Sequence, residues 1–231
     1  MSRTRARELA RQHLANNDPK GWFEALYAEA HGDKNGVPWA DMSVNPHLAQ
    51  WLDTHSISGQ SKTALVIGCG LGDDAEELAK RGFQVTAFDI SPEAIRWAKK
   101  RFAASNVNYV ATDLLAAPES WHNSFDLVIE IYTLQVLPPE LRPSAMTAMA
   151  KFVCPNGVLL VVARGRDETD DKGTMPWPLT CAELEVFSAQ GLKLIRFEDY
   201  MDEETPSVRR FRVEFIRPTM LGNHILDKTL N

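Results

Sequence analysis

The sequence predicts an α/β fold: a three-layer sandwich around a mostly parallel seven-stranded sheet that ends in an antiparallel hairpin. Three observations predict it. From residue 63 onward, five short apolar runs alternate with helical stretches, the pattern of βαβ units. A glycine-rich turn follows the first run directly. Two final strand-like runs follow each other without a helix between them, and such strands pair antiparallel.

The five parallel strands are expected at residues 63–67, 84–88, 107–111, 125–130 and 158–163, and the hairpin at 192–200 and 209–217. Helices are expected at 2–14, 22–30, 45–51, 141–152 and 184–190, besides two between the first three strands. Asp73 and Asp74 place carboxylates in the first turn of a helix that runs to residue 80, where the helix dipole favours them. Ser91-Pro92-Glu93 offers an N-cap, a proline at the first helical position and an acidic first turn for the next helix.

The length of 231 residues fits one α/β domain. We expect N-terminal helices and a lid loop over 1–60, a ligand-binding core over 61–220, and a tail over 221–231. The loop at 32–43 belongs to the first part. The sequence does not indicate an oligomeric state.

The composition restricts the class of partner. The chain is 44% hydrophobic and 24% charged with a net charge of −6, and no basic stripe rises above that background, so DNA and other long nucleic acids are disfavoured. The longest apolar run, 157–163, is far shorter than the roughly 18 to 20 residues that span a bilayer, so no membrane segment is expected.

The cysteine and histidine spacing indicates neither a disulfide framework nor a metal site. The three cysteines are odd in number and lack a CxxC pattern, which favours a reducing, cytoplasmic compartment. We expect Cys154 and Cys181 to be ordinary buried thiols. The six histidines never approach metal-ligand spacing.

The residues that carry chemistry follow the first three strands. The first strand runs into Gly68-Cys69-Gly70-Leu71-Gly72, where side chains would obstruct a ligand resting on the backbone. Asp89 follows the second strand and can take two ribose hydroxyls by bidentate hydrogen bonding. Asp113 follows the third strand. Ligands of such sheets bind outside these carboxyl ends, at the switch in strand order.

A dinucleotide fits this turn poorly. It would require Gly or Ala at position 73, so that pyrophosphate could approach the helix N-terminus, and the chain has Asp73 there. Two like charges about 4 Å apart repel by ~1 kcal/mol even in water. A ligand with ribose, adenine and a cationic amino-acid tail, but no phosphate, suits the site better, and S-adenosylmethionine is such a ligand.

From residue 64 to 163, and more loosely to 217, the chain resembles class I S-adenosylmethionine-dependent methyltransferases, a Rossmann-like family. The segments that carry the resemblance are Val66-Ile67-Gly68-Cys69-Gly70-Leu71-Gly72, Phe88-Asp89-Ile90-Ser91, Ala111-Thr112-Asp113-Leu114, residues 125–130 and Cys154-Pro155-Asn156-Gly157.

The resemblance implies roles for individual residues. Gly68 and Gly70 would hold the methionine part, Asp89 the ribose and Asp113 the adenine amino group. Residues just after the fourth strand would close over the sulfonium. The full expected sets are Gly68, Cys69, Gly70, Asp89, Ile90, Asp113, Leu114, Glu130, Ile131 and Trp39 for the cofactor, and Tyr132, Trp177 and Arg164 for the substrate.

The chain departs from the family in one respect. Many members have an acid two residues before the first glycine, and this chain has Val66 there. Thiopurine and halide methyltransferases, which act on small molecules, are similar in lacking it. Residues 36–39, Gly-Val-Pro-Trp, are also similar to a segment of such enzymes in which the tryptophan lies near the cofactor.

Purely structural interpretations remain beside these roles. Asp89 and Asp113 could simply cap the helices that follow them. Trp22, Phe23 and Tyr27 have the helical spacing of core residues. Trp39 and Trp177 lie in loops that contain glycine and proline, and we hypothesise that the two indoles form an aromatic cover over the acceptor.

The expected function is transfer of a methyl group from S-adenosylmethionine to an N, O or S nucleophile of a small molecule. Glu130, Tyr132 and Asp199 are candidates for a general base, and none is preferred. The alternatives are a module that binds S-adenosylmethionine without turnover, a methyltransferase acting on protein or RNA, and an NAD(P) oxidoreductase, against which Asp73 argues. The acceptor cannot be identified from the sequence.

Overall fold

Seven strands form one sheet in the computed structural model, which describes residues 2–219. The strand order is β3-β2-β1-β4-β5-β7-β6, with β7 antiparallel to both of its neighbours and the other pairs parallel. The predicted fold class is therefore confirmed, including the terminal hairpin. The strands are β1 (Thr63–Ile67), β2 (Gln84–Asp89), β3 (Asn108–Ala111), β4 (Phe125–Ile131), β5 (Val153–Arg164), β6 (Lys193–Met201) and β7 (Arg209–Ile216).

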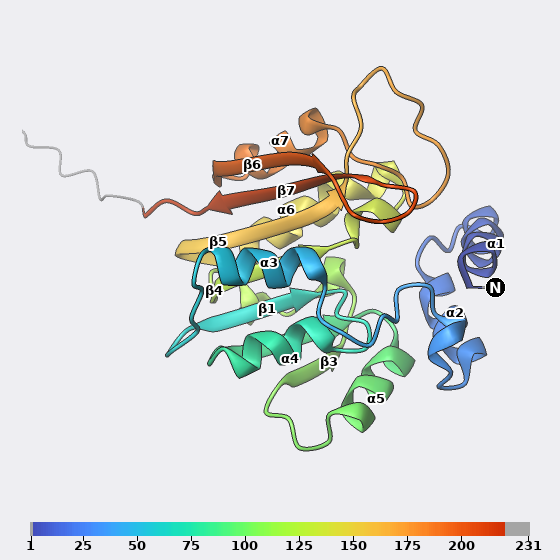
Figure 1. Cartoon of the computed structure of the whole chain (residues 1–231), viewed down its shortest axis with the longest axis horizontal. Helices are drawn as coiled ribbons and strands as arrows, with labels where there is room; N and C mark the ends of the chain where they lie inside the picture. The colour runs from blue at the N-terminus through green and yellow to red at the C-terminus, as the bar shows by residue number, and fades with distance from the viewer. Residues whose placement is uncertain (1, 220–231) are drawn as a thin grey trace, which may run out of the picture.

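Helices cover both faces of the sheet, which makes three layers (Figure 1). Alternation along β1 produces this arrangement, because Ala64 and Val66 pack in one apolar cluster while Leu65 and Ile67 pack in another. The first cluster includes α3 (Pro46–Thr54), α4 (Asp73–Lys80) and α5 (Pro92–Arg101). The second includes α6 (Arg142–Phe152) and α7 (Cys181–Ala189).

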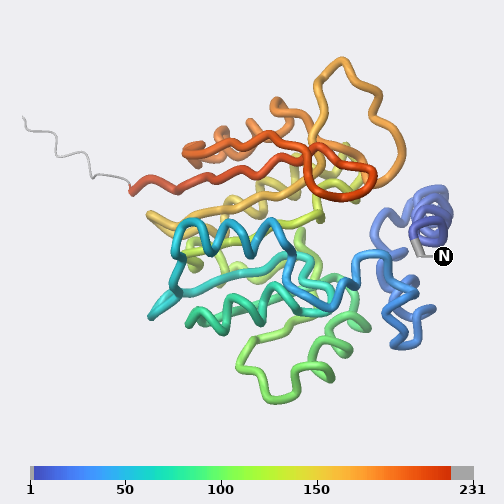
Figure 2. Tube along the Cα trace, viewed as in Figure 1, coloured from blue at the N-terminus to red at the C-terminus, as the bar shows by residue number. Residues whose placement is uncertain are grey.

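The first two helices, α1 (Ser2–Ala15) and α2 (Gly21–Ala30), lie beyond the carboxyl ends of the parallel strands rather than on a sheet face (Figures 1 and 2). They pack on each other through Leu9, Trp22 and Leu26, and Met175 of the loop after β5 joins the same cluster. The chain therefore places a helical cover where a ligand of a parallel sheet binds.

The capping signals operate as the sequence predicts. The Ser91 side chain accepts a hydrogen bond from the Ala94 N–H at 3.0 Å, with Pro92 at the first helical position. The Asn45 side chain accepts from the His47 N–H at 3.0 Å and so caps α3. Both caps hold the segments that enter the carboxyl edge of the sheet.

Most elements lie within one residue of their expected bounds, but α3 extends three residues further, to Thr54, and two elements begin well before their expected first residue. Helix α7 begins at Cys181, three residues early, because Thr180 and Glu183 form a reciprocal capping box. Strand β5 begins at Val153, directly after α6, and includes Pro155-Asn156-Gly157. Those turn residues form an irregular extension of the strand: Val153 pairs with Phe125, and the Asn156 N–H donates to the Arg217 carbonyl at 2.7 Å.

The expected burial is correct for Trp22 and Tyr27, which are both 1% exposed, whereas Phe23 is only partly buried. The expectation of buried thiols was wrong: Cys181 is exposed, since it lies at the first position of α7, and Cys154 is partly buried.

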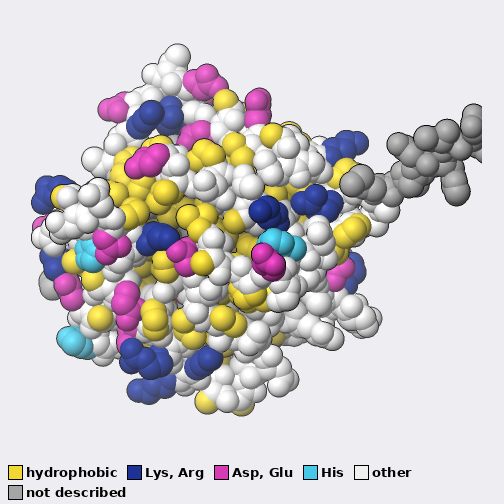
Figure 3. Space-filling view, turned by 180° about the vertical axis from the view of Figure 1, so that it is seen from behind, with side chains coloured by type: hydrophobic (Ala, Val, Ile, Leu, Met, Phe, Trp, Pro, Cys, Tyr) yellow, Lys and Arg dark blue, Asp and Glu magenta, His cyan; other side chains and the backbone are white. Residues whose placement is uncertain are grey.

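The surface of the described residues gives no support for a broad charged interface on the side opposite to that of Figure 1. Basic side chains there occur in small groups among acidic and hydrophobic ones (Figure 3). Within residues 2–219, no helix is both long and apolar enough to cross a bilayer. The expected tail, 221–231, lies wholly outside the described residues.

Candidate functional site

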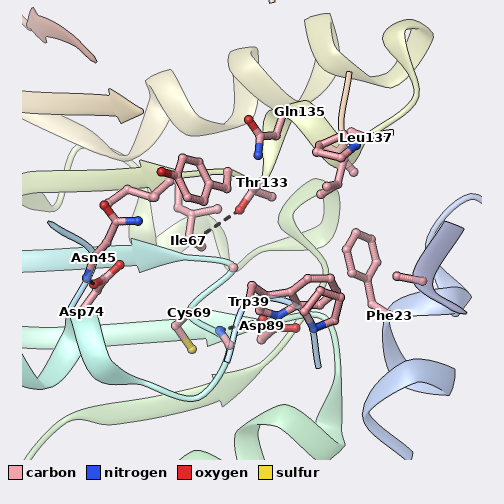
Figure 4. A pocket seen from close by; sticks show the side chains of 18 of the residues that line it. Phe23, Trp39, Asn45, Ile67, Cys69, Asp74, Asp89, Thr133, Gln135 and Leu137 are labelled. Carbon is pink, nitrogen blue, oxygen red and sulfur yellow. Dashed lines mark hydrogen bonds between the residues drawn. The ribbon is translucent and has the colours of Figure 1, made fainter. Parts of the chain in front are cut away.

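A cavity of about 860 Å³ opens at the carboxyl edge of the sheet, under α1 and α2. Its volume lies within the ~300–1,000 Å³ that is usual for small-molecule sites. The cavity brings together eleven of the thirteen residues expected from the sequence, and Figure 4 shows several of them. These are Trp39, Gly68, Cys69, Gly70, Asp89, Ile90, Asp113, Leu114, Ile131, Tyr132 and Arg164.

The glycine turn after β1 has a conformation that side chains would obstruct. Gly68 and Gly70 have φ angles of +60° and +51°, in the left-handed region that favours glycine. A Cβ on Gly68 would lie 2.4 Å from Thr133 Oγ1, and one on Gly70 would lie 3.1 Å from the Tyr27 hydroxyl. The turn therefore presents bare backbone to the cavity.

Asp89 is 7% exposed and combines a structural role with a position in the cavity wall. Its Oδ2 accepts from the Gly70 N–H and its Oδ1 from the Ser91 N–H, both at 2.9 Å (Figure 4). Burial raises the pKa of this carboxyl. Each oxygen has a further lone pair, so Asp89 can also accept from ligand hydroxyls.

Asp113 caps the short 3-10 helix Leu114–Ala116, since its Oδ1 accepts from the Leu115 N–H at 3.0 Å. Its Oδ2 forms an ion pair with the Lys20 ammonium, which comes from the residue before α2. An adenine amino group would therefore bind Asp113 together with Lys20, or displace Lys20 from Asp113.

The two acids at the start of α4 have different surroundings. Both terminal nitrogens of Arg101 donate hydrogen bonds to the Asp73 carboxylate, at 2.7 and 2.8 Å. The guanidinium therefore compensates the negative charge of Asp73. Within residues 2–219, the Asp74 carboxylate accepts only the Asn45 N–H, at 2.7 Å, and has no cationic partner. Burial raises its pKa to about 6, and it lines the cavity wall at the glycine turn.

Beyond β4, the cavity is lined by Tyr132 and Thr133 and then by Gln135 (Figure 4). Burial raises the pKa of Tyr132 to about 12. The Arg210 guanidinium lies 4.7 Å from the centre of its ring. Tyr132 therefore stays protonated near neutral pH and cannot serve as a general base there.

Glu130 does not line the cavity, contrary to the expectation. It is fully buried, and its Oε1 accepts from the Thr133 and Leu134 N–H groups at 2.7 and 2.9 Å. Strand alternation explains the difference: Glu130 lies on the same face as Val128, toward the α6 layer. Its carboxylate shapes the turn after β4 and is not available to an acceptor.

Trp177 is not among the residues that line the cavity, whereas Met175 and Pro176 are. Its backbone N–H donates to the Gln135 carbonyl at 2.7 Å, and its carbonyl accepts from Arg142 at 3.0 Å. The Trp177 indole packs against the α1–α2 cluster, as Trp39 does. Trp39 does face the cavity, with its Nε1 donating to the Tyr27 hydroxyl at 2.7 Å.

Asp199, the third candidate base, does not line the cavity either. It lies on β6 and forms a bidentate pair with Arg209 at 2.8 and 2.7 Å, which lowers its pKa. None of the three candidates therefore presents a basic group to the cavity.

Several cavity residues were missed by sequence reasoning. They come from α1, from α2 and its N-cap, from the N-cap of α3, from the turn after β6 and from β7, and they are Arg3, Arg7, Lys20, Phe23, Asn45, Glu204 and Arg210. Only Asn45 had a local signal, its capping position before Pro46. Among residues 2–219, no group of three or more His, Cys, Asp or Glu side chains is placed to hold a metal ion.

The strand order, the glycine turn after β1 and the acids after β2 and β3 define a Rossmann-like protein with its site at the switch between β1 and β4. Residues 64–157 match the sequence model of a family described as a methyltransferase domain. Over this segment the chain is similar to methyltransferase domains, and it shares its fold with the solved methyltransferase structures below.

Two curated relatives illustrate the sequence match. An uncharacterized methyltransferase of Mycobacterium tuberculosis is 33% identical over 125 residues, or 54% of this chain and 60% of the relative. A ubiquinone biosynthesis O-methyltransferase of Burkholderia vietnamiensis is 35% identical over 117 residues, or 49% of each protein. The chain thus spans about half to three fifths of the length of these relatives.

Solved structures share the fold at low identity. The 1,6-didemethyltoxoflavin-N1-methyltransferase of Burkholderia thailandensis has a TM-score of 0.67 at 16% identity, covering 85% of this chain and 87% of that one. A structure described as converting a disulfide bond into a thioacetal group in echinomycin biosynthesis has a TM-score of 0.68 at 21% identity, covering 84% and 91%. The [4+2]-cyclase SpnF has a TM-score of 0.62 at 15% identity, covering 74% and 79%.

Replacing Asp89 with Ala is expected to weaken binding of S-adenosylhomocysteine by about 10- to 150-fold, because a charge-assisted hydrogen bond contributes roughly 1.5–3 kcal/mol. Calorimetric titration measures the change. Asp171→Ala in the exposed loop after β5 is the control, and an unchanged dissociation constant in folded Asp89→Ala protein would refute the assignment of Asp89.

Glu130→Gln is expected to remove a pH-dependent loss of stability. Burial raises the pKa of Glu130 from 4.5 to about 7 in the folded protein, so the native state binds the extra proton. The stabilising contribution is complete below pH 4.5 and is lost as the pH rises through 7. The free energy of unfolding is measured with urea at pH 5 and pH 8 for both proteins. Between pH 5 and pH 8, the wild type should lose on the order of 2 kcal/mol more of this free energy than the variant. Parallel pH profiles for both proteins would contradict this.

Proposed function

We propose that the protein binds S-adenosylmethionine and transfers its methyl group to a small-molecule acceptor. The observation that carries the proposal is a single cavity with two differently lined parts. One part has the glycine turn, Asp74 and Asp89, and suits a nucleoside with a cationic tail. The other continues past Tyr132 to Arg164 and leaves room for a second molecule.

The residues of the first part match the chemical groups of this cofactor. Asp89 would accept from the ribose hydroxyls, and Ile90 and Leu114 would flank the adenine. Asp74 would pair with the ammonium of the methionine part. Many family members have an acid at the position of Val66, and in this chain Asp74 would take the role of that acid. The glycine turn would allow the methionine part to approach the backbone.

The cofactor supplies an electrophilic methyl group: as the acceptor's lone pair forms its bond to carbon, the S–CH3 bond breaks and its electron pair returns to sulfur. The residues of this chain act by holding the two molecules together and excluding water under α1 and α2. Positioning of this kind can contribute about 7–11 kcal/mol to lowering the barrier. None of the three candidate bases presents a basic group to the cavity. The site therefore suits an acceptor whose nucleophile already has a free lone pair and needs no deprotonation.

The relatives support a small acceptor without identifying it. The name of one Burkholderia enzyme denotes O-methylation in ubiquinone biosynthesis, and the name of the other denotes N1-methylation of 1,6-didemethyltoxoflavin. The cyclase SpnF shares the fold, so binding without methyl transfer is the alternative that needs a direct test. A protein or RNA acceptor is the other alternative, which the net charge of −6 disfavours for RNA.

Turnover is tested with S-adenosylmethionine carrying a radiolabelled methyl group and a panel of small N, O and S nucleophiles. Labelled product that depends on Asp89 supports the proposal. Tight binding of S-adenosylhomocysteine with no product from any acceptor class, including protein and RNA, supports a binding module. NAD is the control ligand, and NAD binding tighter than S-adenosylhomocysteine would overturn the proposed cofactor.

The role of Asp74 predicts a pH dependence of cofactor binding. The ammonium pairs with the charged carboxylate, whose pKa in the free protein is about 6. Affinity for S-adenosylhomocysteine should therefore be complete above this value and fall about tenfold between pH 7.5 and pH 5. Asp74→Asn should bind more weakly at pH 7.5 and lose most of this fall. An identical pH profile in the variant would assign the titration to another group.

A further inference from the structure

Two carboxylates and two guanidinium groups of the cavity come from opposite halves of the strand order. Asp89 ends β2 and Asp113 follows β3, whereas Arg164 ends β5 and Arg210 lies on β7. Strands β1 and β4 separate β2 from β5, and neighbouring strands lie about 4.8 Å apart. The ends of β2 and β5, which carry Asp89 and Arg164, are therefore roughly 15 Å apart across the sheet.

Arg210 is already compensated within the protein. Its Nε pairs with Asp202 at 2.7 Å and its Nη2 with Glu204 at 2.6 Å. The guanidinium also stacks over the Tyr132 ring. Arg210 is thus a fixed part of the wall with its charge balanced by two acids.

Arg164 lies beside Arg210 in the β5–β7 pair and lacks such compensation. Its backbone N–H donates to Gln135 Oε1 at 2.8 Å, but within residues 2–219 its side chain has no hydrogen bond or ion pair. Its Nε is buried without a partner. Burial, Arg210 and Arg3 all lower the pKa of Arg164, and the acid that opposes them, Glu204, is bonded to Arg210.

Two further arginines from α1 line the cavity. Arg7 donates through Nε to the Met175 carbonyl at 2.7 Å, and no carboxylate within residues 2–219 lies within 4.0 Å of Arg3 or Arg7. Phe23 and Pro176 supply apolar wall beside them. Arg3 and Arg7 are exposed, whereas Arg164 is partly buried. Because a partly buried cation without a counter-ion is costly, Arg164 favours an anion in this part of the cavity, and the apolar wall favours an apolar body attached to it.

We infer that the methyl acceptor carries a carboxylate and that the Arg164 guanidinium binds this carboxylate at the end of β5. This rests on the proposed methyl transfer and names the class of acceptor. A planar carboxylate matches the fork of a guanidinium. Glu204 opposes a second negative charge in the same place, which favours a carboxylate over a phosphate dianion. Held there, the acceptor extends past Tyr132 toward the glycine turn.

The test compares aromatic acids with their uncharged amides on protein saturated with S-adenosylhomocysteine. The probes are benzoate, 4-hydroxybenzoate, anthranilate and indole-3-acetate, the four primary amides, and phenylphosphonate. Affinities are measured by saturation-transfer NMR and calorimetry for the wild type, Arg164→Gln and Arg164→Lys. The matched control is Arg96→Gln, an exposed arginine on α5 that pairs with Glu93.

The tightest acid should bind roughly tenfold or more tightly than its amide to the wild type and to Arg96→Gln. Arg164→Gln should reduce this preference to less than about twofold, and Arg164→Lys should retain part of it. The affinity for S-adenosylhomocysteine should not change in either Arg164 variant.

Three outcomes would overturn the inference: no acid preferred over its amide, a preference that survives Arg164→Gln, or phenylphosphonate bound more tightly than benzoate. Failure of the wild type to bind S-adenosylhomocysteine would instead overturn the proposed function. This binding is measured first, before any aromatic acid is added. The two failures are therefore distinguishable.

Discussion

The hydrogen bond from the Gly70 N–H to the Asp89 carboxylate joins the turn after β1 to the end of β2, and the site depends on it. It fixes the glycine turn against the neighbouring strand, together with the Cys69 N–H bond to the Phe88 carbonyl at 2.9 Å. On the other side, Thr133 Oγ1 leaves no room for a side chain at Gly68. A turn held from both sides can keep its backbone bare without collapsing onto the sheet. The same bond directs a buried carboxylate to the cavity, so one contact serves the fold and the ligand site.

The local parts of this arrangement were predictable from the sequence. Strand positions, the Ser91 and Asn45 caps, the glycine turn and the acids after β2 and β3 all follow from periodicity and short-range chemistry. Glu130 and Trp177 were expected in the site from their position along the chain, but neither lines the cavity. Strand alternation turns Glu130 toward α6, and Trp177 packs against the α1–α2 cluster. The contributions of α1 and α2 could not be predicted, since no local pattern shows that Lys20 meets Asp113, a contact across 93 positions.

Fixed charges distinguish the two parts of the cavity. Asp73 and Arg210 line it with charges that partners within the protein already compensate, at Arg101 and at Asp202 with Glu204. Among residues 2–219, Asp74 and Arg164 line it without such partners. The groups left uncompensated are thus of opposite sign on opposite sides of the β1–β4 switch. Two ligands of opposite charge would be sorted by this field before any contact with the reacting atoms.

The family match covers some of the residues that line the cavity and leaves out others. The matched family segment, residues 64–157, contains the glycine turn and the acids after β1, β2 and β3. Arg3, Arg164 and Arg210 lie outside it, on α1, at the end of β5 and on β7. The glycine turn, Asp89 and Asp113 thus lie in one continuous matched stretch, whereas the arginines of the cavity come from the two ends of the chain. Under the proposed function, such a layout would let acceptor preference diverge by changes in the flanking segments while the matched stretch is left intact.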